Sequence, residues 1–521
     1  MKKIFKGLLF CSLMLSLLLG GCGKQQKTAG GGSDTVTFWV KNACSEFVSS
    51  YNDVESLKEM QKKIGINVEY IHPSSGSVET QFNILMASGE FPDIIEYDWA
   101  NSYPGGVSKA YQDGIITKLN EHMNQLPNYS EAIKKYSDSY VSELDGSVFL
   151  FATLKDNELS NSYYGHMVRE DWLEKLGIPI PETIDDWYEM LKAFKSKDPN
   201  GNGQADEIPY TTYKGGGFFD FAPAWGVMKG TFHPTPDGRF VYGSIEPAFK
   251  DFLIEMNKWY SEGLIDPEFS SIDKSVTDSN MANDIAGSTT GYIGSQMGNY
   301  LSARKDDPSY KLIATPWPAL KQGMPQYLGT QITRLGVYGV GAAVTQKSKN
   351  LDAALKFLDY CYSDEGTILQ NWGIEGVTYE KNGENYMLTD MVSKSTEGKS
   401  AVQVMTPYAM TGYGLHPKVT LGDAYQAVMN DHPSQKAAAK QWAEGDKTLL
   451  TINYPFTTEE NKKLNSILSE IRTYEDEVLM KMVMGLEPIS NFDAYVSQMK
   501  ALGIDEAIQI HKTAYERYMN Q

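Results

Sequence analysis

The fold is decided by three short β-rich stretches near the start of the chain: TVTFWV at residues 35–40, INVEYI at 66–71 and DIIEY at 93–97. Their apolar residues alternate or run together, as buried and half-buried strands require. Helix-like stretches near residues 54–64 and 80–88 separate them. This alternation is typical of a parallel sheet in an α/β fold. We expect a ligand to bind beyond the carboxyl ends of the strands.

Aromatic residues are unusually frequent, with 9 Trp and 32 Tyr in 521 residues. Amphipathic rings suit the recognition of glycans or peptides. Some of them lie at expected strand ends, and others beside glycine or proline, where a ring can stand exposed. We predict that the ligand-binding residues are Trp39, Asp98, Trp99, Trp225, Tyr292 and Tyr413. For each ring the alternative is packing in the core.

The overall composition bounds the class of protein. The formal net charge of −19 disfavours a nucleic-acid partner, because phosphate binding needs a basic surface. The mean hydropathy of −0.38 is that of a globular chain. A body of roughly 500 residues predicts two or more domains.

The first residues resemble a bacterial lipoprotein signal. Lys2, Lys3 and Lys6 precede an apolar run at 8–19, which is too short to span a bilayer. The run ends in Leu-Gly-Gly-Cys at 19–22. We therefore expect a signal peptide at 1–21, a lipid-modified Cys22 bearing acyl chains such as palmitate, and a flexible tether over 22–34. Two acyl chains would hold the protein on the membrane.

Two cysteines remain in the mature body, Cys44 and Cys361. Outside the cytoplasm they either form a disulfide or stay as two buried thiols, and we favour the thiols. Two helix starts carry a capping signature, Thr183 with Asp186 and Thr457 with Glu460.

One loop has the spacing of a metal site. It reads DPNGNGQADE at 198–207, with side-chain oxygens at alternate positions and glycines for a tight turn. This matches the first half of an EF-hand calcium loop, although Pro209 stands where the bidentate Glu is expected. We predict a structural Ca²⁺ held by Asp198, Asn200, Asn202, Gln204 (through its backbone carbonyl), Asp206 and Glu207. The alternative is a turn without metal.

Catalytic motifs are missing from the sequence. We find no nucleophile elbow, metalloprotease motif or phosphate-binding loop, and we assign no catalytic residues. Spacing alone still permits a carboxylate pair of the glycosidase kind.

Several ordered stretches resemble one known family: REDWLEKLG at 169–177, KWYSEGLIDP at 258–267, GIEGVTY at 373–379 and AYERY at 514–518. Together with the 198–209 loop they are similar to extracellular solute-binding lipoproteins (family 1) of carbohydrate ABC importers. The resemblance is strongest to the large branch that binds alginate oligosaccharides or N-glycans. It implies a calcium ion in the matching loop.

The resemblance also implies an architecture and a function. We expect a two-lobed, periplasmic-binding-protein-like fold (type II) whose lobes close on a ligand about a hinge. We place the N-terminal lobe at 35–155 and 311–370 and the C-terminal lobe at 156–310 and 371–521. The protein would be a monomer, anchored extracytoplasmically, that passes an oligosaccharide to a membrane permease without chemistry. The alternatives are an anchored polysaccharide lyase or glycoside hydrolase, and a sugar-sensing subunit of a signalling system.

Overall fold

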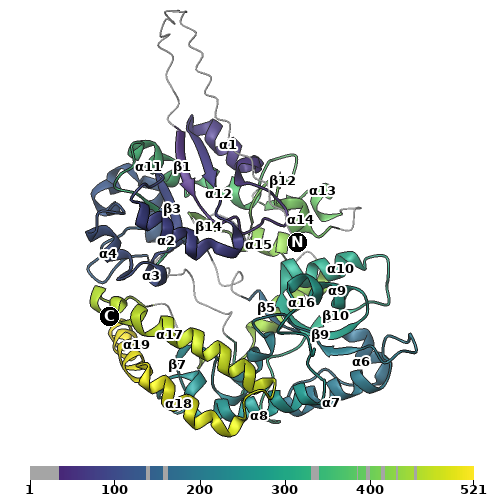
Figure 1. Cartoon of the computed structure of the whole chain (residues 1–521). Helices are drawn as coiled ribbons and strands as arrows, with labels where there is room; N and C mark the ends of the chain where they lie inside the picture. The colour runs from purple at the N-terminus through teal and green to yellow at the C-terminus, as the bar shows by residue number, and fades with distance from the viewer. Residues whose placement is uncertain are drawn as a thin grey trace, which may run out of the picture. The chain divides into compact units, whose positions relative to one another are not determined.

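The computed structural model describes residues 35–136, 141–156, 162–329, 339–383, 385–394, 399–411, 417–429, 432–450 and 454–520. Helices and strands are mixed over this part of the chain, and the two largest sheets each have four strands. The expected α/β class is confirmed (Figure 1).

The first sheet contains the three predicted strands. They are β1 (Thr35–Trp39), β2 (Asn67–Ile71) and β3 (Ile94–Asp98), and β11 (Val340–Val344) joins them in the order β11-β3-β1-β2. The strand β1 pairs in parallel with β2 and β3, whereas β11 runs antiparallel to β3. The predicted parallel core of the sheet is therefore present.

The helices between these strands lie where the sequence places them. They are α1 (Glu55–Ile64) and α2 (Val78–Ser88). Helix α1 ends at Gly65, whose φ of 70° lies in the left-handed region that glycine adopts without strain. The turn at Gly65 directs the chain straight into β2.

The second sheet has the order β10-β5-β9-β6, from β10 (Leu312–Ala314), β5 (Tyr164–Arg169), β9 (Ala286–Tyr292) and β6 (Ile208–Tyr210). The strand β5 is antiparallel to both β10 and β9, and β6 is parallel to β9. The sheet packs with α6 (Glu170–Leu176), α7 (Ile184–Ser196) and α8 (Pro247–Ser261).

Helix α7 begins with the predicted capping box. The Thr183 hydroxyl accepts the backbone N–H of Asp186 at 3.1 Å, and the Asp186 carboxylate accepts the backbone N–H of Thr183 at 2.9 Å. Such caps satisfy N–H groups that the helix itself leaves unpaired. The apolar face of the helix then buries Trp187, Met190, Leu191 and Phe194.

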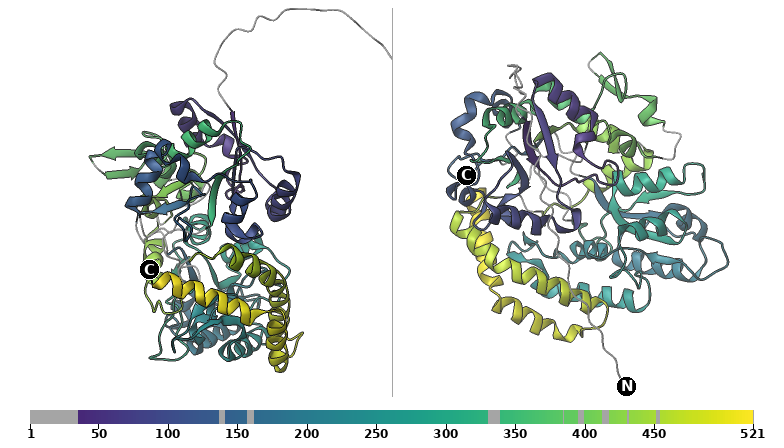
Figure 2. Two further views of the ribbon diagram at one scale, coloured as in Figure 1. Left: turned by 90° about the vertical axis from the view of Figure 1, so that its left-hand side faces the viewer. Right: turned by 45° about the horizontal axis from the view of Figure 1, so that its top comes forward.

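Three helices end the chain: α17 (Thr458–Val483), α18 (Phe492–Ala501) and α19 (Ile504–Met519). Helix α19 packs against both α17 and α18 (yellow-green to yellow in Figure 2). The predicted Thr457–Glu460 capping box opens α17, and its apolar stripe packs into the core of the second sheet.

Helix α17 is held at two places along its length. Near its start, the Asn465 amide donates to the backbone carbonyl of Tyr103 at 3.3 Å. Ten residues further on, the buried Glu475 carboxylate accepts hydrogen bonds from the hydroxyls of Tyr242 and Ser244. The helix thus connects the region after β3 with the region around β8 (Phe240–Tyr242).

Two segments pack differently from the expected lobe boundaries. The strand β10, placed with the first lobe at 311–370, pairs instead with β5 of the second sheet. Within the predicted C-terminal segment 371–521, Met410 and Val419 belong to the apolar core around the first sheet. The chain therefore crosses between the two sheets more often than the sequence suggested.

The remaining helices with at least six residues are α4 (Gly106–Gln112), α5 (Pro127–Lys135), α9 (Lys274–Ala282), α10 (Gly298–Ala303), α11 (Leu351–Tyr360), α12 (Asp364–Asn371), α15 (Gly422–Met429) and α16 (Pro433–Ala443). Shorter helices are α3 (Trp99–Ser102), α13 (Asp390–Ser393) and α14 (Ala401–Met405). The short strands are β4 (Thr153–Lys155), β7 (Phe232–Pro234), β12 (Tyr379–Asn382), β13 (Asn385–Leu388) and β14 (Lys418–Thr420).

The cysteines and the helix lengths complete the description of the body. Cys44 and Cys361 are both buried and free, as favoured from the sequence. Among the described residues, no helix combines the length and the apolar character needed to cross a membrane. The signal segment and Cys22 lie outside the described residues.

Candidate functional site

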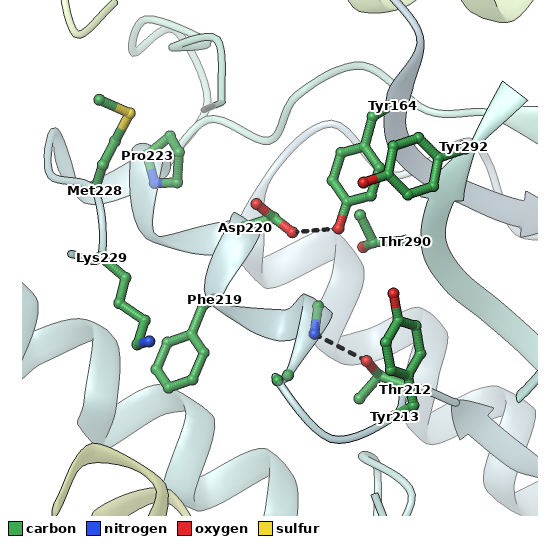
Figure 3. Close-up of a pocket in the computed structure, with 13 residues that line it drawn as sticks. Tyr164, Thr212, Tyr213, Phe219, Asp220, Pro223, Met228, Lys229, Thr290 and Tyr292 are labelled. Carbon is green, nitrogen blue, oxygen red and sulfur yellow. Dashed lines mark hydrogen bonds between the residues drawn. The ribbon is translucent and has the colours of Figure 1, made fainter. Parts of the chain in front are cut away.

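A cavity of about 320 Å³ opens beside the second sheet. It lies between β5, the end of β9 and the segment 212–229 (Figure 3). Its polar lining residues are Tyr164, Thr212, Tyr213, Asp220, Lys229, Thr290 and Tyr292. A cavity walled by aromatic rings and a few directed polar groups is the usual form of a small-ligand site.

Glycines shape one wall of the cavity. Gly215 and Gly216 have φ values of 116° and 68°, so side chains there would be strained. A Cβ added at Gly217 would lie 3.2 Å from the Thr212 hydroxyl oxygen. That oxygen accepts the Gly217 backbone N–H at 2.8 Å. The glycines therefore let the chain turn tightly into the 3₁₀ helix η5 (Gly217–Trp225).

The helix η5 presents Asp220 to the cavity. Phe218 and Phe221 on the same short helix are fully buried in the core, and they fix its orientation. The Tyr164 hydroxyl of β5 donates a hydrogen bond to the Asp220 carboxylate at 2.8 Å. Two residues far apart in sequence thus form one polar group facing the ligand space (Figure 3).

Burial changes the ionisation of this pair. Desolvation raises the pKa of the Asp220 carboxyl to about 7, although the Tyr164 hydrogen bond and the charge of Lys229 both act to lower it. Desolvation, together with the nearby Asp220, raises the pKa of Tyr164 well above its usual value. Tyr164 therefore keeps its proton and remains a donor, while Asp220 titrates near neutrality.

Lys229 is the cation of the cavity. Its ammonium pairs with Asp476 of α17 and lies 4.9 Å from the centre of the Phe219 ring. The same charge lowers the pKa of both Asp220 and Glu475 against the effect of their burial. Lys229 therefore pairs with one carboxylate, Asp476, and stabilises the charged form of two others, Asp220 and Glu475.

The rings that line the cavity pack against one another at its edge. Tyr292 meets Tyr164 edge-on, with ring centres 4.9 Å apart, and lies nearly parallel to Tyr163 at 6.1 Å. Aromatic faces bind the apolar faces of sugar rings, and carboxylates and hydroxyls bind sugar hydroxyls. Of the described residues that line the cavity, Asp220 alone has a carboxyl group.

The predicted ligand residues lie in different places relative to the cavity. Tyr292 lies in the cavity wall. Trp225 lies at the end of η5 but does not line the cavity; its ring packs against Phe252, with centres 5.5 Å apart. Tyr413 lies outside the described residues.

Trp39 and Trp99 are buried, and the half-buried Asp98 caps a helix. Trp39 is 6% exposed and Trp99 is 0% exposed, and both belong to one apolar cluster with Phe82. The Asp98 carboxylate caps α3 by accepting the backbone N–H of Asn101 at 3.1 Å. The same cluster contains Val107 and Ala110 of α4, so the alternative role for these two rings, core packing, holds in this structure.

Most of the residues that line the cavity are not recognisable from the sequence. Asp220 stands in the run GFFDFAPAW at 217–225, which looks like a buried apolar segment. The available signal was the preceding Gly215-Gly216-Gly217, a run that permits close backbone approach. Tyr164 carried no local signal, because its role depends on a partner 56 residues away.

The loop 198–207 is held by its own side chains. Asp198 accepts the backbone N–H groups of Gly201 at 2.8 Å and Asn202 at 3.1 Å. The side-chain amide of Asn202 donates to the Asp206 carboxylate at 3.0 Å. The predicted residues are thus brought together on one short turn.

The fit of this loop to calcium rests on Glu207. Its Oε1 is buried without a hydrogen-bond partner, and burial, with the charges of Asp198 and Asp206, raises the pKa of Glu207. A cation would satisfy that oxygen and offset the repulsion. Among the described residues, no cluster of three or more His, Cys, Asp or Glu is already arranged for a metal. The amides of Asn200 and Asn202 would have to turn their oxygens inward, and such amide assignments are interchangeable.

Comparison with known proteins assigns the family. A family model for bacterial extracellular solute-binding proteins matches residues 49–368, more than half of the chain. The lipoprotein LipO of Bacillus subtilis (strain 168) is 28% identical over 375 residues, which cover 70% of this chain and 72% of LipO. The fructooligosaccharide ABC transporter substrate-binding protein FusA of Streptococcus pneumoniae serotype 4 is 23% identical over 490 residues, 90% of this chain and 87% of FusA.

A solved structure shows the same fold. The alginate-binding protein AlgQ2, determined without calcium ion, superposes with a TM-score of 0.77 at 24% identity, covering 92% of this chain and 98% of AlgQ2. The expected two-lobed binding-protein fold is thereby confirmed. The chain belongs to the family of bacterial extracellular solute-binding proteins.

Proposed function

We propose that this protein is a membrane-anchored substrate-binding protein that captures an oligosaccharide and delivers it to the permease of an ABC importer. The observation that carries the proposal is the cavity in which Tyr164 and Tyr292 stand beside Asp220, in a chain of the solute-binding family. The protein is a binding protein and not an enzyme.

The cavity suits a sugar through two kinds of contact. The ring of Tyr292 offers a face for stacking, worth about 0.5–1.5 kcal/mol beyond area burial. Asp220 accepts hydrogen bonds from hydroxyls, and Thr212, Tyr213 and Thr290 offer further hydroxyl partners. FusA, which matches most of this chain, is described as binding fructooligosaccharides.

Anchoring through Cys22 is part of the proposal. The apolar run at 8–19 and the Leu-Gly-Gly-Cys at 19–22 support it. The relative LipO carries the name lipoprotein. A lipid at Cys22 would keep the body next to the permease and raise its local concentration there.

Calcium at the loop 198–207 is proposed as a structural ion. The residues that would hold it are Asp198, Asn200, Asn202, Gln204 through its carbonyl, Asp206 and Glu207. When bound, the ion supplies charge neutralisation and fixes the turn. The loop leads directly into β6, whose Tyr210 hydroxyl lies 2.6 Å from the Thr290 hydroxyl at the cavity. A fixed turn would therefore steady one wall of the ligand site.

The two sheets are proposed to be the centres of two lobes that close on the ligand. Closure works by differential affinity, because a ligand that binds the closed arrangement better shifts the population toward it. The permease then distinguishes the loaded protein from the empty one.

A screen of purified protein on a glycan array, followed by isothermal titration of each hit, tests the function. We expect saturable binding of at least one oligosaccharide, a rise in melting temperature with ligand, and no new reducing ends after prolonged incubation. Released or unsaturated products would refute a pure binding role. Failure to bind any oligosaccharide would refute carbohydrate capture.

A further inference from the structure

The cavity has few charged groups among its described lining residues. Among the described lining residues, Asp220 and Lys229 are the two acidic or basic side chains. The rest of the lining consists of tyrosines, threonines, glycines and apolar side chains. The electrostatic preference of the site therefore depends on whether the charge of Lys229 is available to a ligand.

Lys229 lines the cavity but already has two partners. Its ammonium forms an ion pair with Asp476 and lies over the ring of Phe219 at 4.9 Å. Behind it, Glu475 is 2% exposed and held by Tyr242 and Ser244. The charge of Lys229 also acts on the buried carboxyl groups of Asp220 and Glu475, so little of it is left to attract an anionic ligand.

Asp220 has one oxygen left to offer. The Tyr164 hydroxyl occupies one carboxylate oxygen at 2.8 Å. Figure 3 shows the other oxygen turned away from Tyr164, on the side of Met228 and Pro223. An ionised carboxylate only accepts hydrogen bonds, so the group it meets must bring a proton, as a sugar hydroxyl does.

We infer that the cavity selects uncharged sugar residues and rejects uronic acids, with Asp220 as the specificity-determining residue. This inference rests on the proposed function and narrows its substrate class. A neutral ring stacks on Tyr292 and donates a hydroxyl to Asp220. A uronate placed there brings a second carboxylate beside Asp220 and must compete with Asp476 for Lys229.

The physical basis is the cost of like charges in a partly desolvated space. Such pairs strongly disfavour the wrong partner at an interface, and the screening that weakens surface charges is reduced in a cavity. The distinction matters because proteins with this fold include both kinds of binder by name: FusA for fructooligosaccharides and AlgQ2 for alginate, a polyuronate.

Titration calorimetry of matched sugars tests the inference. The probes are galactotriose with trigalacturonate, mannotriose with its mannuronate counterpart, and kestose as a further neutral sugar. We expect the neutral member of a bound pair to bind at least about tenfold more tightly, equivalent to 1.4 kcal/mol. Equal or tighter uronate binding would overturn the inference and leave the proposed function standing. If the protein binds none of these probes and no sugar on the glycan array, both the inference and the proposed function are refuted.

Asp220→Asn supplies the decisive comparison. It keeps the shape of the side chain and removes its charge, so the ratio of neutral to uronate affinity should fall by at least about tenfold. The titrations are made at about pH 8, above the Asp220 pKa of about 7. Asp251→Asn, an exposed position on α8, makes the same charge change away from the cavity and should leave the ratio unchanged.

A second variant covers the case in which Asp220→Asn does not fold. Asp476→Asn, at an exposed position, releases Lys229 from its ion pair and should shift the ratio toward uronates as well. A ratio that stays at the wild-type value in every folded variant would overturn the inference.

Discussion

Replacement of Tyr292 by alanine separates a ligand-binding ring from a structural one. The ring is only partly buried and stands in the wall of the cavity. A stacked ring contributes about 0.5–1.5 kcal/mol beyond area burial. Since 1.4 kcal/mol is tenfold in affinity, Tyr292→Ala should weaken binding by about twofold to about thirteenfold. Tyr292→Phe keeps the ring face and should bind nearly as well as the wild type.

The same substitution should cost little stability. Tyr292 loses edge and face contacts with Tyr164 and Tyr163, but it is not enclosed. We therefore expect a loss below the roughly 3–5 kcal/mol typical of a buried aromatic residue. Trp99→Ala is the opposite case, because the ring is 0% exposed. It should lower the free energy of unfolding by about 3–5 kcal/mol while the folded fraction keeps its affinity.

The assay combines isothermal titration with urea unfolding on each variant, using an oligosaccharide identified on the glycan array. Wild-type affinity in Tyr292→Ala, together with a large loss of unfolding free energy, would refute a role for this ring in binding. A loss of affinity in the folded Trp99→Ala protein would show that the buried cluster around Phe82 and Trp99 communicates with the ligand.

Three other changes have expected outcomes. Cys22→Ala should abolish incorporation of a labelled fatty acid, and continued labelling would place the lipid elsewhere. Asp198→Ala combined with Asp206→Ala should remove calcium-dependent stabilisation, which at 100-fold excess of calcium over Kd amounts to about 2.7 kcal/mol. A chelator should lower the melting temperature of the wild type and leave that of the double variant unchanged. Because the pKa of Asp220 rises from 3.8 to about 7 on folding, its stabilising contribution is present below about pH 4 and is lost as the pH rises through 7. In urea unfolding, the stability of Asp220→Asn should therefore fall less than that of the wild type between about pH 4 and pH 7. An unchanged pH profile of stability would contradict the raised pKa of Asp220 in the folded protein.

Local patterns predicted the elements of this fold well. The strands β1 to β3 and the capping box at Thr183 each depend on residues that are neighbours in sequence. Periodicity and hydrogen bonding over three or four residues therefore determine them. The loop 198–207 could be proposed as a calcium site for the same reason, since its candidate ligands are all within ten residues.

The candidate ligand site could not be found in this way, because the residues that line it come together only through packing. Trp99 follows a strand, as expected, but α3 begins at that residue and turns the ring inward onto Phe82. Asp220 looks like a polar interruption in an apolar helix until β5 places Tyr164 opposite it. Exposure of a side chain is a property of what covers it, and the covering elements here come from distant parts of the chain.

The two attachments of α17 make its length a fixed quantity. Asn465 and Glu475 are ten residues apart and bind partners in different regions, Tyr103 on one side and Tyr242 with Ser244 on the other. One residue inserted between them would rotate the later half of the helix by about 100° and turn Glu475 away from its partners. Seven inserted residues would restore the direction to within about 20° but move the anchor about 10 Å along the axis. Between residues 465 and 475 of α17, outward-facing side chains can therefore be substituted, but residues cannot be inserted or deleted without breaking one of the two attachments.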